Sequence, residues 1–188
     1  MKKILIGCAL LSLFCNASAA CKAPQFEAFA QQQISADNNG HLTSIEVEMQ
    51  PVATLRMPSG FTKLGSLPYG SVIFGGHPKG ISAVLTYETE QTIAVHEKGV
   101  TPASFMLSLF KGLNKTGCSY MEGQRLADED YRLYAKFDKG AELFAYGKSS
   151  THQFYLIHPN KPNLVLNGLF KNISRPEFEI ILSTIVVK

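Results

Sequence analysis

A strict alternation of apolar and polar side chains over residues 131–137 is the feature that most constrains the fold. Apolar or aromatic residues occupy the odd positions, and Arg, Tyr and Lys occupy the even ones. A period of two is that of a β-strand with one buried face. Turn-forming residues follow at 138–140, and a second apolar segment at 142–147 returns the chain. The pattern therefore predicts an antiparallel hairpin in the middle of a larger sheet.

Further strand patterns lie on both sides of this hairpin. Short runs rich in Gly, Pro and Asn separate them, as expected for turns between antiparallel strands. Together with the hairpin they predict an antiparallel sheet of about seven strands, or eight if every segment joins it. The additional segments are 44–49, 52–57, 71–74, 81–88, 151–158 and 164–170.

Two helices are predicted from their start signals. Thr101 can cap a helix in which Pro102 takes the first position, where a missing N–H costs nothing. Ser174 and Glu177 form a capping box that opens a C-terminal helix. A weaker amphipathic pattern covers residues 24–34. A mid-chain helix and a C-terminal helix packed on an antiparallel sheet predict an α+β domain.

The first twenty residues have the order of an export signal. Two lysines precede an apolar run at 4–15, and small residues follow at 16–20. The apolar run is too short to span a hydrocarbon core of about 30 Å, and no later segment predicts a transmembrane span. This short signal is typical of bacteria, so we expect a cleaved signal peptide and a periplasmic or secreted product.

Removal of residues 1–20 leaves a single α+β domain over 21–188, with an N-terminal arm at 21–40. The two lysines lost with the signal lower the formal charge from +3 to +1. A nearly neutral domain lacks the basic excess of nucleic-acid-binding proteins, so nucleic acid is not an expected partner.

Cysteine usage changes with export. Cys8 and Cys15 leave with the signal, so Cys21 and Cys118 remain. An even pair in an oxidising compartment predicts one disulfide bond, which would hold the N-terminal arm against the body. The alternative is a membrane-anchored lipoprotein with its lipid on Cys21, because small residues precede that cysteine. Ser18 stands where a lipoprotein signal usually has leucine, and lipidation would leave Cys118 as a lone thiol.

The order of elements also resembles a known family. A strand runs into a Pro-x-Gly-aromatic turn at 57–61, followed by a mid-chain helix, an antiparallel meander and a last helix ending at 181–188. This layout resembles the PsbP-like domain, and within it the bacterial envelope proteins of the DcrB type, over residues 45–188. The resemblance implies an α/β/α sandwich, a non-catalytic binding or assembly role, and no shared catalytic residues. DcrB-type proteins are typically lipid-anchored, whereas this signal departs from their cleavage motif.

Motifs that carry chemistry are missing from the sequence. No two histidines have the i, i+4 spacing of a helical zinc site, and no Gly-x-Ser-x-Gly elbow is present. The acidic run at 128–130 lacks the spacing of a calcium loop. We therefore expect no metal site, no cofactor and no enzymatic activity. The histidines are His41, His77, His96, His152 and His158.

Aromatic and basic side chains of the hairpin form the candidate binding site. If they lie together on one face of the sheet, they make a surface rich in the residue types that protein interfaces favour. The alternative is that helices cover this face and the tyrosines belong to the edge of the core. The five residues are Arg132, Tyr134, Lys136, Phe144 and Tyr146.

These features favour a non-catalytic binding or assembly protein of the bacterial cell envelope, with another periplasmic protein as its partner. The alternative is an immunity protein that neutralises a secreted toxin by direct binding. A third hypothesis is an enzyme with an unrecognised site, which would require His77, His96 and acidic side chains in one pocket.

Overall fold

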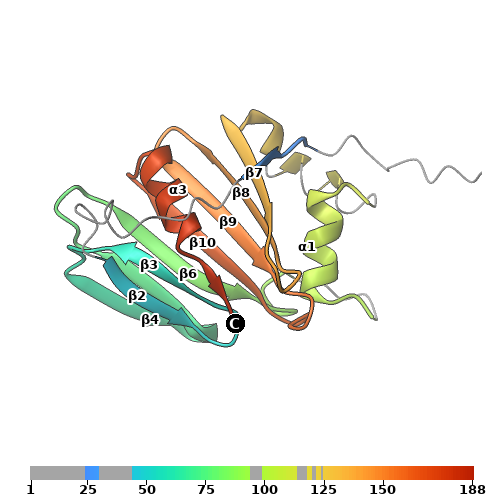
Figure 1. Ribbon diagram of the computed structural model, residues 1–188, viewed down its shortest axis with the longest axis horizontal. Coiled ribbons are helices and arrows are strands. Elements are labelled where there is room, and N and C mark those ends of the chain that lie inside the picture. Colours follow the sequence, from blue (N-terminus) through green and yellow to red (C-terminus); the bar gives the residue numbers. More distant parts are fainter. Residues whose placement is uncertain (1–23, 30–43, 94–98, 114–117, 120–121, 124) are drawn as a thin grey trace, which may run out of the picture.

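A computed structural model describes residues 24–29, 44–93, 99–113, 118–119, 122–123 and 125–188. The expected signal peptide at 1–20, Cys21 and most of the predicted arm at 21–40 lie outside the described residues. A large sheet forms the middle layer, a small sheet lies against one of its faces, and helices lie on both faces (Figure 1).

The large sheet has eight strands in the order β1-β7-β8-β9-β10-β6-β5-β4. All its pairs are antiparallel except β1 with β7. Short 3-10 turns, η2 (Pro68–Gly70) and η3 (Leu126–Asp128), interrupt the connections. The strands are β1 (Glu27–Ala28), β4 (Lys63–Leu67), β5 (Ser71–Gly75), β6 (Ser82–Glu88), β7 (Tyr131–Lys136), β8 (Glu142–Lys148), β9 (Thr151–Ile157) and β10 (Val165–Lys171).

The α+β class and the predicted hairpin are confirmed, but the prediction of one sheet is wrong. β2 (Ser44–Met49) and β3 (Ala53–Pro58) form a second sheet together with β11 (Val186–Val187). β11 follows the C-terminal helix and pairs with β3, which ties the end of the chain to this small sheet. Tyr87 on β6 donates a hydrogen bond to the carbonyl of Gln50 at 2.8 Å and links the two sheets.

Both start signals for helices are confirmed. α1 (Pro102–Phe110) begins after Thr101, whose hydroxyl accepts from the backbone N–H of Ser104 at 3.2 Å. α3 (Arg175–Ser183) begins after Ser174, which forms the predicted capping box with Glu177. Each box satisfies N–H groups that the first helical turn leaves without partners.

The helix predicted over residues 24–34 is wrong for its described part, 24–29. Glu27 and Ala28 form β1 and pair in parallel with Leu133 and Tyr134. Phe26 places its ring edge-on to the ring of Phe144, with 5.3 Å between the centroids. Strand pairing and this aromatic contact outweigh a weak helical pattern that has no capping signal.

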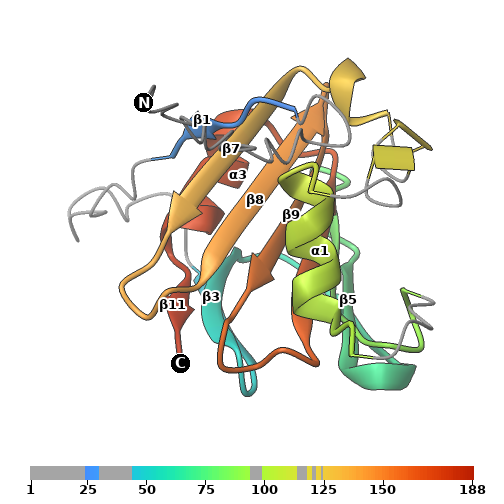
Figure 2. The ribbon, with the colours of Figure 1, turned by 90° about the vertical axis from the view of Figure 1, so that its right-hand side faces the viewer.

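Two hydrophobic cores fill the spaces between the layers. The first lies between the large sheet and the face formed by α3 and the small sheet, and includes Leu55, Phe154 and Phe178. The second lies between the large sheet and α1, and includes Met106 and Tyr155. Figure 2 shows α1 lying in front of β9. The central strands are therefore buried on both faces.

Gly168 on β10 allows the ring of Phe154 to lie directly over the backbone. A Cβ at this position would come within 2.7 Å of the Phe154 Cζ atom, and that side chain is fully buried. We expect Gly168→Ala to lower the free energy of unfolding by about 1–3 kcal/mol, because the ring has no space into which to shift. Urea denaturation followed by circular dichroism measures this loss.

Gly65→Ala is the matched control for this substitution. Gly65 also lies in a strand, but a Cβ there would meet only the Cβ of Ile73, at an ordinary 3.8 Å. We expect its stability to stay within about 0.5 kcal/mol of the native protein. Equal stabilities for the two variants would contradict the tight packing inferred at Gly168.

Candidate functional site

The five residues of the predicted binding face do lie on the same side of the large sheet. Arg132 on β7 is paired with Tyr146 on β8, and Tyr134 is paired with Phe144. Lys136 follows on the same side of β7 because strand side chains alternate. The register therefore brings together the residues that the sequence pattern grouped.

That side of the sheet is not open over the hairpin, because α1 covers it. The ring of Phe110 on α1 stacks on Phe144 with 4.7 Å between the centroids, and Phe26 packs on both rings. Phe144 is 2 % exposed and Tyr146 is 7 % exposed. The prediction of an accessible face is thus wrong for these two aromatic residues, which belong to the second core.

Arg132 also has a role within the protein. Its guanidinium donates to the carbonyl of Leu126 at 2.8 Å and to that of Glu129 at 3.2 Å, which fixes the turn before β7. Its Nε donates to the carbonyl of Gln25 at 3.2 Å. Of the five predicted residues, only Lys136 is exposed.

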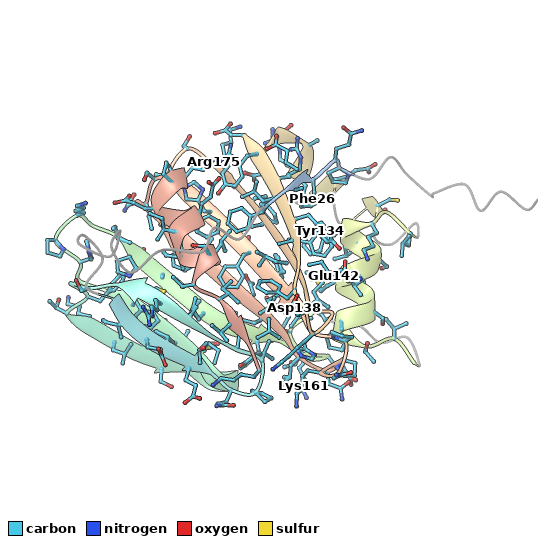
Figure 3. The ribbon with its side chains drawn as sticks, in the orientation of Figure 1. Phe26, Tyr134, Asp138, Glu142, Lys161 and Arg175 are labelled. Atoms are coloured by element: carbon cyan, nitrogen blue, oxygen red, sulfur yellow. The ribbon has the colours of Figure 1, made fainter. Side chains whose placement is uncertain are left out.

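Tyr134 and Glu142 connect the hairpin to the end of α1. Figure 3 shows both residues between β7 and α1. Tyr134 donates its hydroxyl hydrogen to the Glu142 carboxylate at 3.0 Å, and the ammonium of Lys111 lies 2.8 Å from the same carboxylate. Burial, followed by the nearby carboxylate, raises the pKa of Tyr134. This contact anchors α1 rather than offering a binding group.

Beyond α1, the same side of the sheet carries a row of half-exposed side chains. The register places Gln153 beside Leu169, Leu169 beside Val84, and Val84 beside Ile73. Thr86 lies next to Val84 on the same face of β6. All five are neither buried nor fully exposed. We call Ile73, Val84, Thr86, Gln153 and Leu169 the open face.

A network of hydrogen bonds separates the open face from the covered part of the sheet. Tyr146 donates to Gln153 at 3.1 Å, Gln153 donates to Asn167 at 3.0 Å, and Asn167 donates to Glu88 at 2.7 Å. Gln153 also donates to the hydroxyl of Tyr155 at 2.7 Å. We call these five residues, from β8, β9, β10 and β6, the polar network.

Glu88 ends this network on the side nearest β5. Among the residues that the structure describes, its carboxylate makes no ion pair and has Asn167 as its one hydrogen-bond partner. Thr86, on the same face, shares a 2.5 Å hydrogen bond with Ser71 on β5. The network and this hydroxyl pair set polar groups beside the aliphatic residues of the open face.

The sequence interpretation missed both the open face and the polar network. One signal was available, since the even positions of 82–88 place small and polar side chains on the face opposite the core. No comparable signal reveals the network, because Asn167 and Glu88 are 79 positions apart and meet only through the pairing of β10 with β6.

The histidines within the described residues have roles in folding. His152 is buried, and its Nε2 donates to the carbonyl of Ile173 at 2.9 Å while its Nδ1 accepts from the Tyr131 hydroxyl at 2.7 Å. A carbonyl only accepts, so Nε2 carries the proton. Nδ1 of His77 accepts from the backbone of Lys79, and Nδ1 of His158 accepts from that of Asn160. His41 and His96 lie outside the described residues.

The acidic run at 128–130 also contributes to local structure. Asp128 pairs with Arg125 at 2.7 Å, and Asp130 accepts from the backbone of Ser149 at 2.9 Å. Within the described ranges, no three His, Cys, Asp or Glu side chains are grouped so that they could hold a metal ion. Cys118 is buried, whereas Cys21 is not among the described residues, so the pairing of the two stays a prediction.

His152 generates a prediction for stability as a function of pH. Burial, and to a lesser degree the charge of Arg175, lowers its pKa below the usual 6.5. The hydrogen bond to the Ile173 carbonyl, followed by the charges of Asp130 and Glu179, opposes this shift without cancelling it. The unfolded chain therefore binds a proton before the folded protein does. We expect the free energy of unfolding to decrease as the pH falls below about 6.5, because protonation favours the unfolded chain.

Urea denaturation between pH 8 and pH 5 measures this dependence, with His152→Gln and His77→Gln as the compared variants. We expect the decrease below about pH 6.5 to be smaller in His152→Gln and to persist in His77→Gln. Identical slopes in the native protein and His152→Gln would contradict the assignment of the decrease to His152.

Comparison with known proteins gives no family for this chain. No family model matches the sequence, and no curated protein matches it either. In the described part of the chain, no helix combines the length and apolar character that crossing a bilayer requires.

Proposed function

We propose that this chain is an exported, non-catalytic binding or assembly protein of the bacterial cell envelope, and that its protein partner docks on the open face. The observation that carries the proposal is that the exposure of side chains changes along one side of the large sheet. That side is buried under α1 over β8, β9 and the Val165 end of β10, and half-exposed at Leu169 on β10 and over β6 and β5.

The chemistry of the open face suits a protein partner. Leu169, Val84 and Ile73 form a continuous aliphatic row, which can be removed from water on docking. Thr86 and the carboxylate of Glu88 lie beside this row and offer hydrogen-bonding groups. Protein interfaces combine an apolar centre with a polar rim in the same way.

The polar network makes this surface rigid before any partner arrives. Gln153 is held by three side-chain hydrogen bonds, to Tyr146, Tyr155 and Asn167. A side chain that is already ordered loses little conformational entropy on binding. The network therefore supports a binding role for this surface.

The finer description of the fold belongs to the same proposal. A central sheet with a helix on each face is compatible with the α/β/α sandwich that the resemblance to PsbP-like domains implies. The second sheet of β2, β3 and β11 covers part of one face beside α3. Binding without catalysis is the role that this resemblance implies.

Photo-crosslinking tests the docking surface directly. A photoreactive residue at Val84 should give a discrete crosslinked protein in the cells that naturally make this chain. The same residue at Ile180, a partly exposed position on α3 on the opposite side of the large sheet, is the matched control and should give no such product. Mass spectrometry of the product identifies the partner.

The outcomes separate the candidate functions. An envelope component crosslinked at Val84 supports the assembly role, and a secreted toxin selects the immunity alternative instead. Equal products from Val84 and Ile180, or none from Val84 under any growth condition, would contradict docking on the open face.

We also propose that Cys21 and Cys118 form a disulfide in the exported protein. Two observations support the pairing: Cys118 is buried, and Cys21 is the only other cysteine outside the expected signal peptide. We expect the intact mass of the exported protein to show loss of residues 1–19 or 1–20 and of two hydrogens. A mass increased by acyl chains would identify the lipoprotein instead.

A further inference from the structure

The described strands leave four edges, and three of them are protected against pairing with another chain. β1 and β11 have only two residues each, which is too short to template a neighbouring strand. β2 carries Glu46 and Glu48, whose charges disfavour an added copy of the same edge. Short strands and charged side chains are the usual means by which proteins prevent association between edges.

β4 is the edge that lacks these protections. Its five residues, Lys63–Leu67, are all exposed, and it pairs only with β5. Lys63 at its first position is its one charged residue, and it contains no proline. Leu64 is 73 % exposed and Leu67 is 49 % exposed. An exposed edge with a single charge at one end and two uncovered leucines is suited to accept another strand.

We propose that β4 pairs with β4 of a second copy, antiparallel and about a two-fold axis at Gly65, so that two large sheets join into one. This register uses all five residues of each strand. It sets Lys63 opposite Leu67 of the partner copy and Leu64 opposite Ser66 of the partner copy. The two ammonium groups are therefore kept at opposite ends of the pair.

We identify the partner strand as β4 of a second copy because β4 is complementary to itself in this register. An isologous contact requires that one surface fit itself, which excludes like charges at the two-fold axis. Gly65 has neither charge nor side chain at that point. Main-chain hydrogen bonds between the copies and the covering of Leu64 and Leu67 stabilise the pair. This inference does not rest on the proposed docking role of the open face.

Cysteine crosslinking tests the register on the full exported chain. In the proposed dimer the two Gly65 positions face each other at about 4.5–5.5 Å between Cα atoms, within the range that a disulfide can bridge. A Cβ at Gly65 meets only ordinary contacts, so Gly65→Cys should fold. We expect Gly65→Cys to form a dimer that a reducing agent separates on a denaturing gel.

Ser66→Cys is the matched control, because the two Ser66 positions are offset by about 7 Å along the strands in this register and cannot be bridged. Crosslinking of Ser66→Cys in place of Gly65→Cys would overturn the register.

Sedimentation velocity tests the association itself. We expect the native protein to be dimeric at high concentration and Leu64→Lys to be monomeric, since it adds a second charge to the edge. Leu113→Lys, changed at an exposed leucine after α1, should dimerise like the native protein. A native protein that stays monomeric at all concentrations would overturn the proposal, as would a Leu64→Lys variant that still dimerises.

Discussion

The constraint on which the rest of the structure depends is that the central strands of the large sheet are buried on both faces. β8, β9 and β10 are almost entirely buried, so each face of the sheet requires a cover. α3 and the small sheet cover one face, and α1 with Phe26 covers the other. The two covers differ in size, and that difference creates the open face. α1 has nine residues and is about 14 Å long, whereas eight strands span about 34 Å.

Features that depend on neighbouring residues were predictable from the sequence. Thr101 with Pro102, and Ser174 with Glu177, mark helix starts through contacts within one turn. The hairpin of β7 and β8 follows from alternation on both sides of a short turn. Pairings between adjacent segments need no information from the rest of the chain, which is why these elements were found.

Features that depend on distant residues were not predictable. The small sheet joins the hairpin of β2 and β3 to β11, which comes from the other end of the chain. β4 has a glycine and a serine in its middle and no alternating pattern, so it was missed. The predicted binding residues did share one face, as the alternation of side chains along a strand requires. That alternation does not say which other elements cover the face. Phe26 and Phe110 cover it from distant parts of the chain.

β1 lies at one end of the large sheet, far from β4. β1 and β4 are the two ends of the large sheet, about 34 Å apart across seven strand spacings. Pairing with β7 holds Glu27 and Ala28 at the β1 end of the sheet. Two copies joined at β4 would therefore place their β1 strands at opposite ends of one continuous sheet, separated by the full width of both large sheets.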